Sequence, residues 1–149
     1  MTMSSFIQNI RTFAIFLLLF NGVNAIVAGW LLMTDPTGNV LRMSPSLLEY
    51  SPFTNFLIPG IVLFVANGLV SLMIALAAAR KWKYFEQLIS IQGSILTGWI
   101  IIQAIMLQTV NFLHLLFGGI GILLCVFGIV LKSAIEKDQT SSRKNILYH

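Results

Sequence analysis

The stretch that decides the fold is Gln87–Leu131, QLISIQGSILTGWIIIQAIMLQTVNFLHLLFGGIGILLCVFGIVL, which contains no Asp, Glu, Lys or Arg. A helix needs about 20 apolar residues to cross a hydrocarbon layer of ~30 Å, so this stretch is long enough for two crossings. Its polar tetrapeptide Gln108–Asn111 separates two apolar runs and predicts a tight turn between antiparallel helices. Helices are expected because a backbone within lipid must satisfy its own hydrogen bonds.

Two more uncharged stretches, Thr12–Thr34 and Ser51–Ala79, precede this one. The sequence therefore predicts a single all-α membrane domain, an antiparallel bundle of four transmembrane helices. A mobile polar tail is expected from Glu136. Arg11 and the apolar run after it resemble a signal peptide, but the run is too long for a typical one, so we expect an uncleaved anchor. The predicted spans are 12–33, 56–79, 85–107 and 112–131.

The composition excludes several classes of protein. Hydrophobic residues make up 57% of the chain and charged residues 9%, against about 25% charged in a typical globular protein. A soluble enzyme, a disordered linker and a coiled coil do not fit these values. The single cysteine, Cys125, excludes a disulfide framework and a cysteine-built zinc site. His114 and the last residue, His149, suggest no metal site, and no cofactor is expected.

The basic residues predict the orientation, because Lys and Arg accumulate in cytoplasmic loops. With four crossings, only Arg42 falls on the outer side, and both termini are expected in the cytoplasm. Charges at membrane edges also argue against nucleic-acid binding. The basic residues on the predicted inner side are Arg11, Arg80, Lys81, Lys83, Lys132, Lys137, Arg143 and Lys144.

The predicted outer loop between the first two helices, residues 34–55, has about 22 residues and is longer than most connections. Asp35–Gly38 is a turn sequence. Val40–Met43 suggests a short strand, and Pro45–Tyr50 suggests a helical turn. The apolar residues of this loop predict a cap folded onto the outer end of the bundle.

Small and polar residues share single faces of the predicted helices. Close packing through small residues and hydrogen bonds between polar side chains hold membrane helices together. In the fourth span Gly118, Gly121, Cys125 and Gly128 recur every three or four residues, which predicts a packing stripe. Near the bilayer centre, Asn21, Asn24 and Asn67 are expected to form one hydrogen-bonded cluster.

Two interpretations of the polar residues stay open. Amides between membrane helices can be structural, contributing about 0.6–2 kcal/mol each, or they can form the polar floor of a ligand pocket. His114 is the one titratable histidine within the spans, and ionisable residues at such depth are candidates for function. The candidate ligand-binding residues are Asn21, Asn24, Asn67, Gln103 and His114.

The decapeptide SPFTNFLIPG at Ser51–Gly60 resembles an element of a family of small, uncharacterised bacterial four-helix integral membrane proteins. Weaker similarities to that family are Phe20-Asn21-Gly22, Pro36-Thr37-Gly38 and the Gly-x-x-x-x-Gly-Trp-Ile element at Gly93–Ile100, with Gln103 following it. More distantly the chain is similar to DoxX-like four-helix proteins, which are linked to redox partner systems. The resemblance implies four helices and a bacterial origin, hence the bacterial inner membrane, but no chemistry.

The sequence leaves three functions open. No catalytic motif, intramembrane carboxylate pair or phosphate-binding glycine loop is present. The favoured hypothesis is a non-enzymatic membrane protein, either an accessory subunit of another membrane protein or a bundle that binds lipid or another apolar ligand. The second is a small transporter or channel component acting as a homo-oligomer. The third is an outer-leaflet enzyme using His114 for proton transfer with help from Glu49 or Arg42.

Overall fold

The computed structural model describes the backbone of residues 3–147 and the side chains of residues 3–141 and 143. Helices joined by turns make up this part of the chain, and no strand occurs in it. His149 lies outside the described residues. The elements in chain order are α1 (Met3–Thr34), the 3-10 helix η1 (Pro45–Leu48), α2 (Leu57–Val62), the π-helix η2 (Leu63–Leu69), α3 (Val70–Ala79), α4 (Phe85–Leu107) and α5 (Phe112–Leu147).

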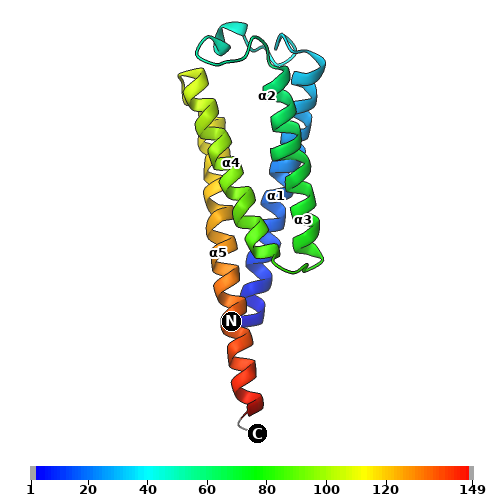
Figure 1. The fold of residues 1–149 in the computed structure, drawn as a ribbon, viewed down its shortest axis with the longest axis vertical. Helices are drawn as coiled ribbons and strands as arrows, with labels where there is room; N and C mark the ends of the chain where they lie inside the picture. The colour runs from blue at the N-terminus through cyan, green and yellow to red at the C-terminus, as the bar shows by residue number, and fades with distance from the viewer. Residues whose placement is uncertain (1–2, 148–149) are drawn as a thin grey trace.

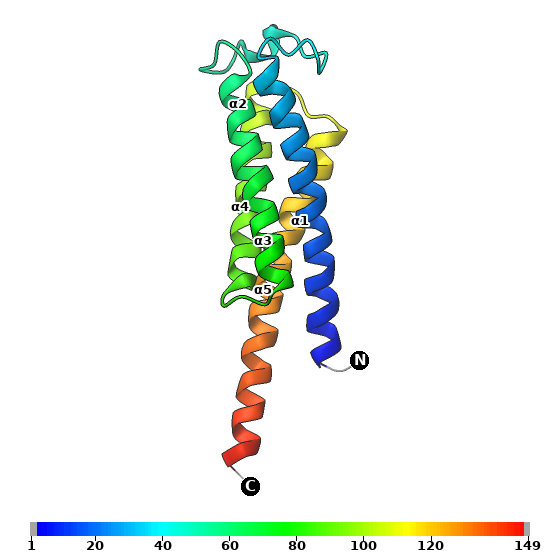
Figure 2. The same cartoon turned by 90° about the vertical axis from the view of Figure 1, so that its right-hand side faces the viewer.

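The long helices lie side by side along one axis, as Figures 1 and 2 show, with the α1–α2 loop at one end and the termini towards the other. Because α2, η2 and α3 follow one another without a break, they form one continuous helical unit. Among the described residues, four helical stretches are long and apolar enough to cross a membrane, with mean hydropathies between 1.7 and 2.5. The prediction of an all-α protein with four such helices is confirmed.

Two helices extend beyond the predicted spans. The first begins at Met3 instead of Thr12, and α5 continues to Leu147 instead of ending at Leu131. The tail predicted to be mobile from Glu136 is therefore helical up to Leu147. Neither extension contains Gly or Pro, so nothing in the sequence breaks the helix where it leaves the apolar layer.

Glycines bring the helices together in two pairs, α1 with α2–η2–α3 and α4 with α5. A Cβ on Gly29 would lie 2.8 Å from the carbonyl oxygen of Gly60 in the first pair, and a Cβ on Gly93 would lie 2.5 Å from that of Gly121 in the second. These contacts leave no room for a methyl group, so each pair packs backbone against backbone.

The two pairs meet around Leu18, Ile89 and Leu124, whose side chains are fully buried in one apolar core. This core lies towards the end of the bundle where the α3–α4 connection turns. Towards the other end, α4 approaches η2 at few points. The pairs are therefore packed at one end and separated at the other.

The connecting residues 35–56 close the separated end (Figure 1). Leu48 and Phe56 are buried against Leu32 of α1, so the loop is a packed cap as the sequence predicted. Gly38 takes a φ of +82°, which suits glycine at this turn. The strand predicted at Val40–Met43 is wrong: Val40–Arg42 form turns, Met43 has no regular secondary structure, and Arg42 has a φ of +54° that does not suit a strand.

Candidate functional site

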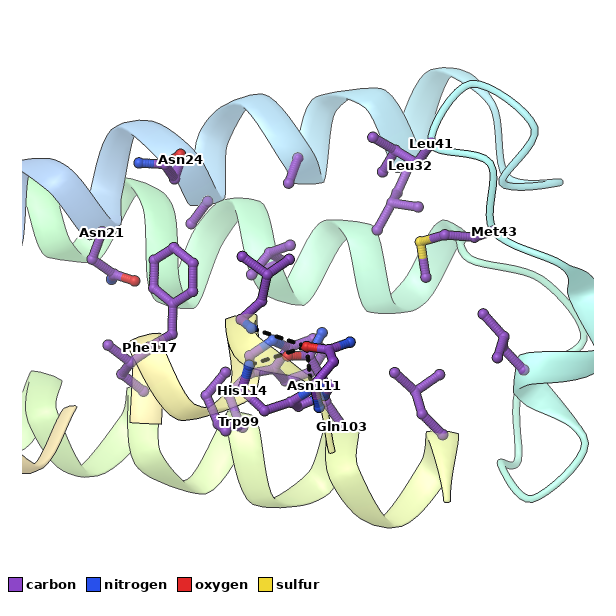
Figure 3. A pocket seen from close by; sticks show the side chains of 18 of the residues that line it. Asn21, Asn24, Leu32, Leu41, Met43, Trp99, Gln103, Asn111, His114 and Phe117 are labelled. Atoms are coloured by element: carbon purple, nitrogen blue, oxygen red, sulfur yellow. Dashed lines mark hydrogen bonds between the residues drawn. The ribbon is translucent and has the colours of Figure 1, made fainter. Parts of the chain in front are cut away.

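A cavity of about 510 Å³ lies between the two helix pairs at the separated end (Figure 3). This volume is within the range of about 300–1,000 Å³ typical of small-molecule sites. Residues Leu41, Met43 and Leu47 of the cap form its roof. Its walls are formed by Asn21, Asn24, Ala25, Ala28 and Leu32 of α1, Leu63 of η2, Leu96, Trp99, Ile100, Gln103 and Leu107 of α4, Thr109 and Asn111 of the α4–α5 turn, and Leu113, His114 and Phe117 of α5.

The cavity opens sideways between α1 and the start of α5. Four of its lining residues have exposed side chains: Asn24 on α1, and Thr109, Asn111 and Leu113 around the α4–α5 turn. Deeper in the bundle, the stacked rings of Phe20 and Phe117, with centroids 6.0 Å apart, connect α1 to α5. The exposed part of the cavity therefore lies beyond this ring pair, beside α1 and the α4–α5 turn.

His114 belongs to the N-terminal cap of α5. The Oδ1 atom of Asn111 accepts the backbone N–H groups of Leu113 (3.0 Å) and His114 (3.3 Å), as an N-cap side chain does. The Nδ1 atom of His114 lies 2.9 Å from the same oxygen. Figure 3 shows Asn111, His114 and Gln103 close together on one wall of the cavity. This part of the site thus follows from the helix start predicted after Asn111.

The short contact decides which nitrogen of the neutral ring carries the proton. Two lone pairs 2.9 Å apart would repel each other, so Nδ1–H of His114 donates to Oδ1 of Asn111. The approach of the Asn111 backbone N–H to Nδ1, at 3.3 Å, would require the opposite tautomer and is the longer contact. Nε2 is then a hydrogen-bond acceptor. It makes no hydrogen bond to any described residue, and the His114 side chain lines the cavity although it is only 7% exposed.

Asn21 forms the polar floor of the cavity. Its Nδ2 donates to the carbonyl oxygen of Asn67 (3.0 Å) and to Oγ of Ser71 (2.8 Å). Its Oδ1 has no hydrogen-bond partner in the described part of the structure. Figure 3 shows the carboxamide of Asn21 directed towards the cavity. The site therefore contains a second free acceptor, and the side chain carrying it is fixed by two hydrogen bonds.

The predicted cluster of three asparagines does not form as expected. Asn24 is exposed and donates to the carbonyl oxygen of Phe20 in its own helix (2.7 Å). Asn67 is fully buried but does not line the cavity, and Asn21 reaches its backbone rather than its amide group. Only Asn21, Asn24, Gln103 and His114 of the five predicted residues surround the cavity. Three residues advance an α-helix by about 300°, so Asn24 is offset from Asn21 by about 60° and falls on the exposed edge of the same face.

Beneath the floor, polar side chains contact the π-helix. Nε2 of Gln92 donates to the carbonyl oxygen of Ala66 (3.2 Å), as Asn21 does to that of Asn67. The amide group of Asn67 and Oε1 of Gln92 are buried without a hydrogen-bond partner in the described chain. Short π-helical segments occur frequently at functional sites. Here the segment joins the cavity floor to the polar interior of the bundle.

The predicted packing glycines divide into close and distant contacts with α4. A Cβ on Gly121 would collide with Oγ1 of Thr97, and one on Gly128 with Oγ of Ser90. At Gly118 the nearest atom belongs to Ile100, at an ordinary distance of 3.5 Å. Cys125 lies on the same seam, with Sγ 3.5 Å from the carbonyl oxygen of Ser90. Close contact therefore ends where α5 passes beside the cavity.

No charged side chain lines the cavity among the described residues. Arg42 and Glu49, considered from the sequence as partners of His114, are exposed on the cap. The described residues contain no group of three or more His, Cys, Asp and Glu residues arranged to hold a metal ion. The lining is thus apolar, with a few uncharged polar groups on the floor and on one wall.

The cap residues of the roof and the role of Asn111 were not predicted from the sequence. The preference for Asn before a helix would have identified Asn111, which directly precedes the apolar run of α5.

No protein-family model, no curated protein and no solved structure matches the chain. The Ser51–Gly60 element lies where the cap joins α2 and does not line the cavity.

Proposed function

We propose that this protein is a non-enzymatic membrane protein that binds an apolar ligand from the bilayer in the cavity between its two helix pairs. The observation that carries the proposal is the cavity itself, about 510 Å³ in volume, with a mostly apolar lining and with exposed lining residues on α1 and around the α4–α5 turn. In a membrane protein an opening at these residues gives access to lipid. Val27 and Trp30 of α1 and Phe112 of α5 are each more than half exposed, so the helices beside the opening present apolar surface.

The test compares the parent protein with Ala28→Phe, which adds an aromatic ring inside the cavity without removing a polar group. Both proteins are purified in mild detergent and their bound lipids are extracted and identified by mass spectrometry. We expect a tightly bound apolar molecule in the parent and its loss from Ala28→Phe. Equal amounts in both proteins, or none in either, would overturn the proposal.

We further propose that the helices form an antiparallel bundle with both termini in the cytoplasm of a bacterial cell. The support is the distribution of Lys and Arg, which places only Arg42 on the side of the cap. The resemblance of Ser51–Gly60 to small bacterial membrane proteins supports the bacterial inner membrane. With this orientation the cavity belongs to the outer half of the bilayer.

The transport hypothesis is supported by the buried polar groups below the cavity floor, Asn67, Ser71 and Gln92, which continue the polar lining inward. Liposome flux measured with the parent and with Asn67→Leu tests this alternative. We expect no difference in flux, because Asn67 is enclosed by protein and reaches no open path. The enzymatic alternative lacks support from the cavity, since neither Arg42 nor Glu49 reaches His114 within the described lining.

A further inference from the structure

We propose that the ligand is an uncharged amphiphile with a hydroxyl group, and that this hydroxyl donates a hydrogen bond to Nε2 of His114. The inference rests on the proposed function and adds the chemical class of the ligand. Its basis is the set of polar atoms in the cavity that no described residue satisfies.

The first step concerns charge. Lipid phosphates, carboxylates and amines need an opposite charge or several donors to replace their hydration in a buried site. No Asp, Glu, Lys or Arg side chain lines the cavity in the described structure. A charged headgroup placed there would be desolvated without compensation, so the buried polar part of the ligand is uncharged.

The second step concerns the direction of the hydrogen bonds. Nε2 of the neutral His114 ring is an acceptor because Nδ1–H donates to Asn111 at 2.9 Å. Oδ1 of Asn21 is an acceptor as well, since its Nδ2 is committed to Asn67 and Ser71. A ligand that only accepts, such as an ester or a ketone, could pair with the buried Nε1–H of Trp99, which has no partner among the described residues, but it satisfies neither of these two acceptors. A hydroxyl group supplies the missing donor.

The third step concerns the oxygen of that hydroxyl. Gln103 lies beside His114 on the same wall (Figure 3), and its amide makes no hydrogen bond to other described residues. Its Nε2 is a donor. One hydroxyl can thus donate to His114 and accept from Gln103, while its apolar chain contacts Leu32, Leu63 or the roof. A single uncharged group thus satisfies His114 and Gln103 on this wall, while Oδ1 of Asn21 on the floor needs a second donor.

The experiment uses Trp99, which lines the cavity, as a fluorescent reporter. Trp30→Phe and Trp82→Phe remove the other two tryptophans, both of which are exposed. The full-length protein is placed in lipid nanodiscs at mildly alkaline pH, where an imidazole is neutral. Dodecyl bromide quenches the fluorescence of Trp99 from within the cavity. The Ala28→Phe protein gives the background quenching by dodecyl bromide that is dissolved in the bilayer. Quenching equal to this background would refute the proposed function itself.

Displacement of the bromide then tests the ligand class with dodecyl alcohol, dodecyl methyl ether and dodecanoate. We expect the alcohol to displace it at concentrations roughly 3- to 10-fold lower than the ether, as expected for one hydrogen bond. Dodecanoate should be the weakest of the three. Equal potency of alcohol and ether, or the highest potency for dodecanoate, would overturn the assignment while leaving apolar binding intact.

Two variants separate the partners of the hydroxyl. His114→Phe removes the acceptor, so the alcohol should lose its advantage over the ether. Gln103→Leu leaves the N-cap hydrogen bonds of α5 intact and removes the donor. Binding of the alcohol and of the ether should therefore weaken by the same factor, so that the ratio of their displacing concentrations is unchanged. The assigned roles would be contradicted if the alcohol kept its advantage over the ether in a folded His114→Phe protein, or lost that advantage in Gln103→Leu.

Discussion

At the scale of single residues, Asn21 and Asn24 show that two equal side chains on one helix have different roles. Asn21 is 1% exposed and joins α1 to the second crossing through Ser71 and the backbone of Asn67. Among the described residues, Asn24 bonds only to Phe20 of its own helix. The contribution of an amide to the bundle therefore depends on which side of α1 it occupies.

We expect Asn21→Leu to lower the free energy of unfolding by about 1–2 kcal/mol, because two hydrogen bonds between helices are lost. Asn24→Leu, the matched control, should change it by less than about 0.5 kcal/mol. Unfolding of the purified proteins by a denaturing detergent measures both values. Similar losses in the two variants would show that the bonds of Asn21 do not stabilise the bundle.

The sequence predicted the residues around the cavity better than their bonding. An asparagine near the middle of an apolar span must find a hydrogen-bond partner. This requirement identified Asn21 from the sequence but did not identify Ser71 as its partner. The turn at Gln108–Asn111 was predicted, yet the tautomer of His114 depends on one contact distance. This contact is local to the first turn of α5, but residue types alone do not give the side-chain rotamers that bring Nδ1 of His114 to Oδ1 of Asn111.

At the scale of helices, glycine determines how closely a pair can pack. Gly121 and Gly119 are two residues apart on α5 but face different surroundings. A Cβ on Gly121 would meet Thr97 and the carbonyl oxygen of Gly93, while no described atom from a neighbouring helix lies within 4 Å of a Cβ on Gly119. The helix pair α4–α5 therefore depends on the first glycine and not on the second.

We expect Gly121→Ala to destabilise the protein by about 1–3 kcal/mol, since the added methyl group forces the two backbones apart. Gly119→Ala should be neutral or slightly stabilising, because alanine favours the helix more than glycine. Thermal unfolding in one detergent compares the two variants directly. A neutral Gly121→Ala would mean that α4 and α5 are less closely packed than their backbone contact implies.

The cap has its own local support at Asp35. Its carboxylate accepts the Thr37 hydroxyl group and the backbone N–H of Val40 (2.8 Å). These hydrogen bonds, the Thr37 hydroxyl first, lower the pKa of Asp35 below its ordinary value of 3.8. A lowered pKa means that this support is complete above pH 3.8 and disappears as the pH falls through the lowered value.

We therefore expect the Val40 amide to be protected from hydrogen exchange at neutral pH and to lose protection in strong acid. In Asp35→Ala the protection should be absent across the whole range, because no carboxylate is present to accept the bond. Glu49→Ala is the control, since the Glu49 side chain makes no hydrogen bond among the described residues. Exchange that responds equally to both substitutions would assign the effect to net charge rather than to the turn.

At the scale of the whole molecule, the helix count was predictable because uncharged stretches of sufficient length are visible in the sequence. The cavity was not. Its existence depends on where close packing stops: the close glycine contacts between α4 and α5 end at Gly121, and the core around Leu18 joins the pairs at one end only. A list of glycines gives the contacts within pairs but does not give the angle between the pairs.

The orientation of the bundle determines which leaflet can supply the ligand. The cap contains one basic residue, Arg42, whereas Arg11, Lys81 and Lys132 lie near the opposite end of the helices. Since Lys and Arg are retained in the cytoplasm, the cap and the cavity should face the outer side. In a Cys125→Ala background we expect Ser46→Cys to react with an impermeant maleimide on intact cells. Lys137→Cys should react only after the membrane is opened; labelling in the reverse order would place the cavity in the inner leaflet and require a cytoplasmic source for the ligand.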